Sequence, residues 1–473
     1  MEIKFGTSGW RAIIAEDFTF DNVKLVVQAI ADYIYFIKAQ DDGVIVTSDT
    51  RFLGEKFREF ASRILAANGI KVYLTNRDTP TPVCAYEIIK RKLAGGINFT
   101  ASHNPPYYQG IKYSPPSGAP APIETTKWIE ERIKEIKTNP INLELKSIED
   151  FKKAGLIEII DPKKEYLKHL KKYIDLKVIK KSKLKIIYDC MHGTGREYLD
   201  SFLKQNGCKV EIINSNLDPY FGGFPPEPAK SNIPELIKLV RSEKNCFGVA
   251  TDGDADRFGF VDFDGSSIDA NQIIALLFDY IINYKNWKGS VVRTLATTHL
   301  IDSIAKKNNI PLHDVPVGFK YIGEIMLKED ILIGGEESGG LSVFRHVPEK
   351  DGILACLLVI EMVARKGKSL KELLKDLYKK YGYFYTSRMN LHLDESTKNN
   401  LLNYLINNTP QNINGKSVEK VDKRDGVKMI LQDGSWILVR FSGTEPIVRF
   451  YCEASNKKEL QKLEQYAKSL LEK

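Results

Sequence analysis

The 473-residue chain is 43% hydrophobic and 27% charged, which is typical of globular proteins, and its length predicts three or four domains. The formal net charge of +8 is a small excess, and arginine and aromatic residues do not alternate in a basic stripe, so we expect a small anionic substrate and no nucleic-acid partner. No apolar stretch has membrane-spanning length, and no basic-then-apolar segment opens the chain, which predicts no membrane partner. Six scattered cysteines without CxxC spacing favour reduced thiols and a cytoplasmic location.

The first region predicts alternating strands and helices that lead into a polar loop. The expected elements are a strand at 44–46, a helix at 55–68, a strand at 72–74, a helix near 85–92 and a strand at 96–99. The following loop places Ser102 beside His103, and Asn104-Pro105 interrupts regular structure. A hydroxyl beside an imidazole indicates a serine that carries a covalent group, with a plain surface turn as the alternative.

A second region repeats this order of elements. The expected elements are a strand at 186–188, a helix near 197–205, a strand at 210–213, a helix near 234–242 and a strand at 247–250. Its loop carries Asp252, Asp254 and Asp256, whose three carboxylates can converge on one divalent cation, and hard oxygen ligands favour Mg²⁺. An EF-hand does not fit, because its required Gly and Glu are replaced by Arg257 and Phe263. A solvated acidic turn is the alternative.

The third region has the same order again. The expected elements are a strand at 291–292, a helix near 298–308, a short strand near Leu312, a helix near 321–326 and a strand at 331–333. The glycine-rich stretch 334–340 carries Glu336, Glu337 and Ser338. These acceptors and this donor suit vicinal sugar hydroxyls, and a flexible surface loop is the alternative.

The last segment differs from the three repeats. Strands expected at 436–439 and 447–451 flank a loop, and a helix follows from about 457 to 471. In the loop, Arg440, Ser442, Gly443 and Thr444 offer a guanidinium, two hydroxyls and exposed amides. This donor set suits a dianionic phosphate, with a β-hairpin turn as the alternative.

We therefore expect an α/β fold with three related mixed-sheet domains and a smaller C-terminal α+β domain around a central cleft. The polar loops are expected at the carboxyl ends of strands. The predicted domains are 1–145 with the serine loop, 146–257 with the Asp loop, 258–380 with the glycine-rich loop and 381–473 with the Arg440 loop. A monomer or a homodimer is expected.

Together the loops supply a nucleophile, a metal site, a reader of sugar hydroxyls and a phosphate clamp, without a Walker A motif or a kinase glycine loop. In this order, and over nearly the whole chain, they resemble the phosphoserine, metal, sugar and phosphate loops of the α-D-phosphohexomutases, with the phosphoglucomutase branch as the closest. The segments Gly6-Thr7-Ser8-Gly9-Trp10-Arg11, Gln109-Gly110-Ile111-Lys112 and Gly318-Phe319-Lys320 resemble further motifs of that family.

The resemblance implies a phosphorylated Ser102, with Mg²⁺ held by Asp252, Asp254, Asp256 and a phosphoserine oxygen. The phosphoryl group would pass to a hexose phosphate, form a hexose 1,6-bisphosphate, and return to Ser102 from the other position. The resemblance also implies that Arg11 lies near the phosphoserine and that Lys112 and His103 are candidates for acid and base roles, although His103 could only orient the loop. The implied substrate-binding residues are Arg257, Lys320, Glu336, Ser338, Lys350, Arg440, Ser442, Gly443 and Thr444.

The expected activity is the reversible interconversion of hexose 1-phosphate and hexose 6-phosphate by an intramolecular phosphotransferase. Glucose phosphates are expected first, because the segment 346–352 resembles phosphoglucomutases and Gly340 stands where other branches often have His. Mannose phosphates, or phosphomannomutase or phosphoglucosamine mutase as the main activity, are alternatives. Two alternatives of another class are a phosphatase with an aspartyl nucleophile in Asp252-Gly253-Asp254 and a non-catalytic sugar-phosphate sensor.

Overall fold

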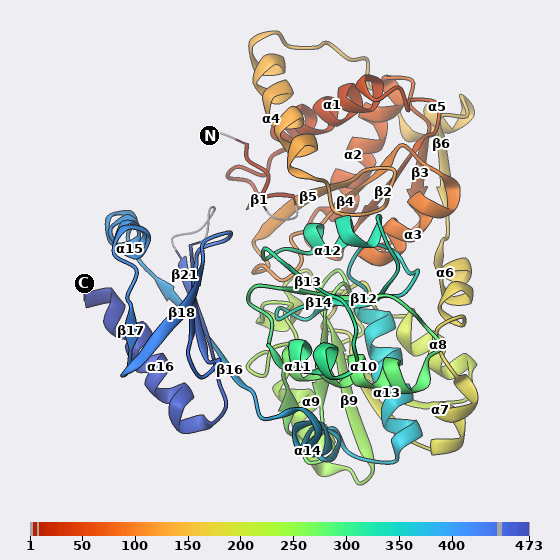
Figure 1. Ribbon diagram of the computed structural model, residues 1–473. Helices are drawn as coiled ribbons and strands as arrows, with labels where there is room; N and C mark the ends of the chain where they lie inside the picture. Colours follow the sequence, from red (N-terminus) through yellow and green to blue (C-terminus); the bar gives the residue numbers. More distant parts are fainter. Residues whose placement is uncertain (1–2, 7–8, 442–446, 473) are drawn as a thin grey trace.

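The computed structural model describes residues 3–6, 9–441 and 447–472, and it contains four β-sheets (Figure 1). In Figure 1 the first three sheets and their helices extend from the top to the bottom of the molecule. The C-terminal domain lies to their left and is reached through one connecting segment. Thr7, Ser8, Ser442, Gly443 and Thr444 of the predicted motifs lie outside the described residues.

The first sheet has the strand order β1-β5-β4-β2-β3-β6. Its strands are β1 (Trp10–Ile13), β2 (Val44–Ser48), β3 (Val72–Thr75), β4 (Gly95–Phe99), β5 (Tyr108–Ser114) and β6 (Ile157–Ile160). The helices around it are α1 (Phe20–Phe36), α2 (Gly54–Ala67), α3 (Thr81–Arg91), α4 (Ile123–Thr138) and α5 (Ile148–Lys153). Every residue of β2 and β4 is buried, because parallel central strands are covered on both faces.

The second sheet has the order β11-β10-β9-β7-β8. Its strands are β7 (Lys185–Asp189), β8 (Lys209–Ile213), β9 (Cys246–Thr251), β10 (Phe258–Val261) and β11 (Ser267–Ile268). Its helices are α6 (Lys163–Leu170), α7 (Leu176–Ser182), α8 (Leu199–Gln205), the short 3₁₀ turn η1 (Phe221–Gly223) and α9 (Pro234–Ser242).

The third sheet has the order β13-β12-β14-β15. Its strands are β12 (Ser290–Thr294), β13 (Leu312–Val315), β14 (Ile331–Glu336) and β15 (Gly340–Val343). Its helices are α10 (Ala270–Tyr284), α11 (Leu300–Lys307), α12 (Phe319–Met326), α13 (Gly352–Lys366) and α14 (Leu370–Tyr381). Most of α13 is buried, and its apolar side chains belong to a core that the second and third domains share.

One pattern of four strands recurs in these three sheets, as β5-β4-β2-β3, β10-β9-β7-β8 and β15-β14-β12-β13. In each, three parallel strands are followed by an antiparallel fourth. The polar segments 100–107, 252–257 and 337–339 therefore occupy equivalent hairpins, each between the third parallel strand and its antiparallel neighbour. This confirms the three related mixed-sheet domains predicted from the sequence.

The C-terminal domain has one antiparallel sheet in the order β16-β21-β20-β19-β18-β17. Its strands are β16 (Tyr385–His392), β17 (Asn412–Ile413), β18 (Lys416–Asp422), β19 (Val427–Leu431), β20 (Trp436–Phe441) and β21 (Ile447–Ala454). The helices α15 (Glu395–Asn407) and α16 (Lys457–Ser469) accompany it, and the 3₁₀ turn η2 (Leu470–Glu472) follows. The predicted α+β character of this part is confirmed.

Two details differ from the sequence expectations. The boundaries predicted at 145/146 and 257/258 separate strands of one sheet, because β6 pairs with β3 and β10 pairs with β9. The glycine-rich stretch 334–340 is a tight hairpin and not a long loop, since Gly334 to Glu336 belong to β14 and Gly340 begins β15. Among the helices of the described residues, none is both long and apolar enough to cross a membrane.

Candidate active site

Ser102 lies in the hairpin between β4 and β5 and is only 2% exposed. Its backbone adopts a left-handed conformation, with φ +51°, which is uncommon for a residue with a side chain. Its N–H donates to Thr100 Oγ1 at 2.8 Å, and its Oγ lies 3.1 Å from Asp252 Oδ2, 150 residues away in the chain. The first hairpin thus meets the second at the predicted nucleophile.

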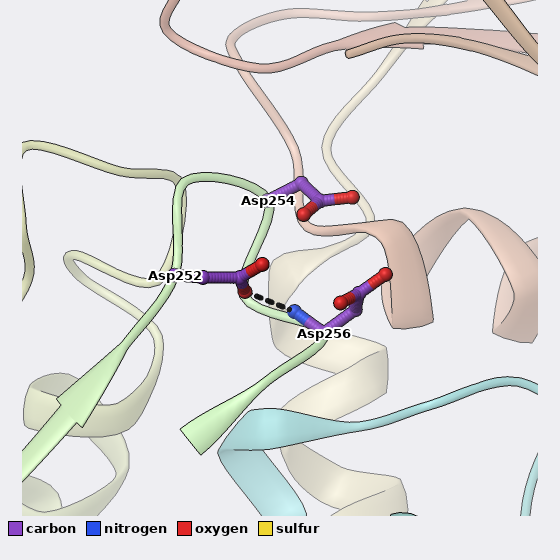
Figure 2. A group of neighbouring side chains, drawn as sticks. All are labelled: Asp252, Asp254 and Asp256. Atoms are coloured by element: carbon purple, nitrogen blue, oxygen red, sulfur yellow. Dashed lines mark hydrogen bonds between the residues drawn. The ribbon is translucent and has the colours of Figure 1, made fainter. Parts of the chain in front are cut away.

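The three aspartates of the second hairpin are completely buried. Asp252 Oδ1 accepts the backbone N–H groups of Asp256 and Arg257, both at 2.9 Å, so the chain curls around this carboxylate. Figure 2 shows the resulting arrangement, in which one oxygen from each of Asp252, Asp254 and Asp256 lies within 4.8 Å of the others. The alternating spacing in the sequence therefore places three carboxylates together.

Two lysines neutralise part of this negative charge. Lys112 of β5 donates from Nζ to Asp254 Oδ2 at 2.6 Å and to Asp256 Oδ2 at 3.0 Å. Lys350 Nζ lies 3.2 Å from Asp256 Oδ2 and 3.1 Å from Glu349 Oε1. Thr81, at the start of α3, donates to Asp254 Oδ2 at 2.5 Å. Side chains from three domains therefore share one buried charge cluster.

The surroundings separate the pKa values of these carboxyl groups. Burial, together with the charges of Asp254 and Asp256, raises the pKa of Asp252 well above its ordinary value. Burial also acts to raise the pKa of Asp254, but Lys112, Thr81 and Lys350 together outweigh it and hold that pKa below the ordinary range. For Lys112, burial opposes the charged form, yet Asp254 and Asp256 raise its pKa. The ammonium and the Asp254 carboxylate thus stabilise each other as ions.

The cluster has the properties of a site for a hard cation. Asp254 Oδ1 and Asp256 Oδ1 are buried and accept no hydrogen bond, although buried carboxylate oxygens normally have partners. Within the described part of the chain, this is the one group of three or more His, Cys, Asp or Glu residues whose ligand atoms lie so close together. An all-oxygen donor set beside the Ser102 hydroxyl fits Mg²⁺.

The predicted neighbours of the serine are also near this hairpin. Arg11 of β1 donates from Nη1 to Asn104 Oδ1 at 2.6 Å, and burial together with the nearby Arg257 lowers the pKa of Arg11 to about 10. Burial, and then the charges of Arg257 and Arg11, lower the pKa of His103 well below its ordinary value. His103 is therefore neutral at physiological pH, and its Nδ1 is buried without a hydrogen bond.

The hairpin of the third domain reaches the Asp loop through the backbone. Gly340 forms an isolated β-bridge with Arg257, the residue that follows the aspartates. Glu336 is 6% exposed and accepts from Ser338 Oγ at 2.8 Å, and burial raises its pKa. The predicted sugar-binding residues Glu336 and Ser338 thus lie next to the predicted metal loop.

Arg440 and Lys320 belong to a second group, which is centred on Asp425. Arg440 Nε donates to both carboxylate oxygens of Asp425, at 3.0 and 2.9 Å, and Asp425 Oδ2 also accepts the backbone N–H of Val317 at 3.0 Å. Burial lowers the pKa of Lys320, and its electrostatic neighbours include Asp425 and Arg440. The predicted phosphate-binding arginine therefore lies where the C-terminal domain meets the segment before α12.

Several residues of the site were not singled out from the sequence. Thr81 and Asp425 have no local signal, because each acts on a partner far along the chain. Asp49 and Arg51 could have been predicted from the sequence, because they directly follow β2. The carboxyl end of β2 lies beside that of β4 in the parallel part of the sheet. Neighbouring parallel strands end at one edge, so polar residues after β2 are expected near the serine loop.

Four family descriptions match consecutive parts of the chain. Residues 2–140, 164–265 and 269–381 match the alpha/beta/alpha domains I, II and III of phosphoglucomutase/phosphomannomutase, and residues 401–468 match its C-terminal domain. A phosphoglucomutase/phosphomannomutase of Thermococcus kodakarensis is 33% identical over 473 residues, which cover 99% of this chain and 98% of that protein. The chain belongs to the phosphoglucomutase/phosphomannomutase family.

Other members of the family differ in the sugar for which they are named. A phosphoglucosamine/phosphogalactosamine mutase of Sulfurisphaera tokodaii is 30% identical, over 99% of each chain. A crystal structure from Thermus thermophilus, of a protein assigned to the phosphomannomutases, is 33% identical with a TM-score of 0.86 over 100% of both chains. As a family member, this protein is an isomerase that acts as an intramolecular phosphotransferase of carbohydrate metabolism. That class excludes the hydrolase and sensor alternatives as its main role.

Proposed function

We propose that this phosphohexomutase interconverts glucose 1-phosphate and glucose 6-phosphate through a phosphorylated Ser102 and a glucose 1,6-bisphosphate intermediate. The observation that carries the proposal is the 3.1 Å contact between Ser102 Oγ and Asp252, within a buried cluster of three carboxylates and two lysines. A serine that only stabilised a turn would have no need of such a cluster, which is built from three domains.

The residues of the chain divide the work of phosphoryl transfer. Asp252, Asp254 and Asp256 would hold Mg²⁺ together with a phosphoserine oxygen, and a bound Mg²⁺ would stabilise negative charge on the transferring group. Arg11 would add positive charge beside the serine, and its bond to Asn104 already orients its guanidinium. Lys112 and Lys350 carry protons on Nζ, because their carboxylate partners raise both pKa values against the effect of burial. Either ammonium would supply the proton that the leaving oxygen takes up, which is Ser102 Oγ when the phosphoryl group passes to the sugar and the sugar oxygen when it returns. His103, the other acid–base candidate, would accept the proton of the attacking hydroxyl.

Substrate binding would use the other two hairpins. Glu336 and Ser338 offer an acceptor and a hydroxyl to the sugar ring. Lys350 contacts Asp256, and Glu336 is one of its electrostatic neighbours. Arg440, with Ser442, Gly443, Thr444 and Lys320, would bind the phosphate that does not react. Arg257 forms the β-bridge between the metal loop and the sugar hairpin. From there its side chain would contact the substrate beside the transferring phosphoryl group.

The preference for glucose phosphates is supported by Gly340 and the segment 346–352, which resemble the phosphoglucomutase branch. The free state of all six cysteines supports a cytoplasmic location, since disulfides are rare there. A monomer or homodimer that binds small hexose phosphates needs no further partner for this reaction.

The deciding experiment is a steady-state comparison of glucose, mannose and glucosamine 1-phosphates, with Mg²⁺ and catalytic amounts of the matching bisphosphate. We expect kcat/KM for glucose 1-phosphate to exceed the other two at least about tenfold, a difference of roughly 1.4 kcal/mol in transition-state binding. Ser102→Ala should abolish turnover, whereas Ser117→Ala, at a half-buried serine of the same domain, should not. Greater kcat/KM with glucosamine 1-phosphate would overturn the sugar preference, and release of inorganic phosphate without glucose 6-phosphate would overturn the mutase reaction.

A further inference from the structure

Arg51 has a fully buried guanidinium whose hydrogen-bond acceptors all belong to the turn after β2 or to the serine hairpin and the first residue of β5. Its Nη1 donates to the carbonyl oxygens of Pro105 and Tyr108 at 2.7 and 3.0 Å. Its Nη2 donates to those of Ser102 and Asn104 at 2.7 and 2.6 Å. Nε donates to Asp49 Oδ2 at 3.1 Å. The five N–H groups of the guanidinium thus have five acceptors.

This set of bonds fixes the backbone on both sides of Ser102. Arg51 Nη2 holds the carbonyl of Ser102, while the N–H of Ser102 donates to Thr100 Oγ1. Asp49 and Arg51 are themselves joined by an ion pair whose two side chains are both 0% exposed. The short turn after β2 therefore holds the carbonyl of the predicted nucleophile, and Thr100 holds its N–H.

The backbone of Ser102 needs such support. A left-handed conformation at φ +51° is unfavourable for a residue with a Cβ, and it persists where the surroundings enforce it. Arg51 also contacts the second domain, because its guanidinium lies 5.1 Å from the ring centre of Phe221 in η1. Arg51 therefore contacts the serine hairpin and the metal-loop domain together.

We propose that Arg51 is a positioning residue, which holds the strained Ser102 hairpin so that Oγ faces the carboxylate cluster. Lysine cannot replace it, because an ammonium has three donors on one atom and cannot span four carbonyl groups and a carboxylate. The role of Arg51 in turnover rests on the proposed function, since Ser102, which Arg51 positions, is the phosphoryl carrier there.

The test compares Arg51→Lys with Arg58→Lys. Arg58 is a matched control, because it is also a buried arginine of the first domain, but it bonds Thr75 and the carbonyl of Arg77, outside the serine hairpin. We expect Arg51→Lys to lower kcat for hexose phosphate about 100-fold with KM changed less than threefold, because small displacements of reacting groups have effects of this size. Arg58→Lys should lower the unfolding temperature and leave kcat within threefold of the wild type.

A second measurement does not depend on activity. Amide hydrogen exchange of the segment 100–108 should be at least about tenfold faster in Arg51→Lys than in the wild type, and unchanged in Arg58→Lys. If Arg51→Lys does not fold, Asp49→Asn takes its place, with a smaller, roughly tenfold loss of kcat, because it weakens the anchor of Nε and leaves the carbonyl bonds. A folded Arg51→Lys protein with wild-type kcat and wild-type exchange would overturn the proposal. A wild-type protein without mutase turnover would overturn the proposed function, and exchange alone would then decide the role of Arg51.

Discussion

The side chain of Lys350 fills the space in front of Gly340. A Cβ atom at position 340 would lie 2.2 Å from Cδ of Lys350 and 2.7 Å from its Cγ, closer than carbon atoms approach without a bond. From this position the ammonium reaches Asp256 and Glu349 at 3.2 and 3.1 Å. Only glycine at 340 leaves this space to the lysine.

Gly340→Ala should therefore move Lys350 away from Asp256. We expect kcat for hexose phosphate to fall at least about tenfold, because the displaced ammonium no longer supplies charge or a proton at the site. The check is a double-mutant cycle with Lys350→Ala. If Gly340 acts through Lys350, adding Gly340→Ala to the Lys350→Ala variant should cost little further activity. If the two losses are fully additive, Gly340 does not act by leaving space for the Lys350 side chain.

Lys112→Met should make the carboxylate cluster depend more strongly on metal. Removing one partner of a buried ion pair costs about 3–5 kcal/mol, so the unfolding temperature without metal should fall. Mg²⁺ should then raise that temperature by more than in the wild type, because it replaces the missing positive charge. Thermal unfolding with EDTA and with Mg²⁺ measures both effects. Lys71→Met, which removes a half-exposed pair with Glu158, is the control. No Mg²⁺ shift in any of the three proteins would count against a cation at this cluster, and equal shifts in both variants would show that Mg²⁺ does not replace the charge of Lys112.

Asp425→Asn should raise KM for hexose phosphates and leave kcat within about threefold. Asp425 orients Arg440 and accepts the N–H of Val317, so its loss weakens binding of a phosphate that is held equally in the ground and transition states. Asp422→Asn is a suitable control, because Asp422 pairs instead with the exposed Arg424. A large loss of kcat at unchanged KM would show that Arg440 acts in the chemical step.

Lys428 predicts a pH dependence of stability. Its Nζ donates to the carbonyl of Leu295 at 2.6 Å and lies 3.9 Å from the ring centre of Trp436, between the third and fourth domains. Burial, with the charge of Arg293, lowers the pKa of Lys428 from 10.5 to about 7. Between these pH values the unfolded chain holds a proton that the folded chain has released, so stability rises with pH by about 1.4 kcal/mol for each unit.

Thermal unfolding at pH values from 7 to 10 tests this dependence. The difference in unfolding temperature between the wild type and Lys428→Met should grow in favour of the wild type as the pH rises. Lys420→Met removes an exposed lysine of the neighbouring strand and should show a constant difference. A difference that shrinks with rising pH in Lys428→Met would mean that the buried lysine stays protonated.

Much of the fold could be predicted because its signals are local. The strands β2, β7 and β12 and the helices after them follow from apolar runs and helical spacing, and the three repeats follow from the order of these elements. The antiparallel strands β5, β10 and β15 were not predicted. The strands β10 and β15 have only four residues each and follow directly on polar turns, so their strand character depends on pairing with β9 and β14.

The sequence by itself determined the four polar segments, the alternating aspartates and the family resemblance, because residues close in the chain stay close in any fold. Only the tertiary structure decided that Ser102 meets Asp252, that Lys112 pairs with Asp254, and that Arg440 is held by Asp425. These contacts depend on which strands are neighbours and on the direction of each side chain. Arg51 shows the limit most plainly, since four of its five acceptors are backbone carbonyls, which every residue has and no sequence pattern marks.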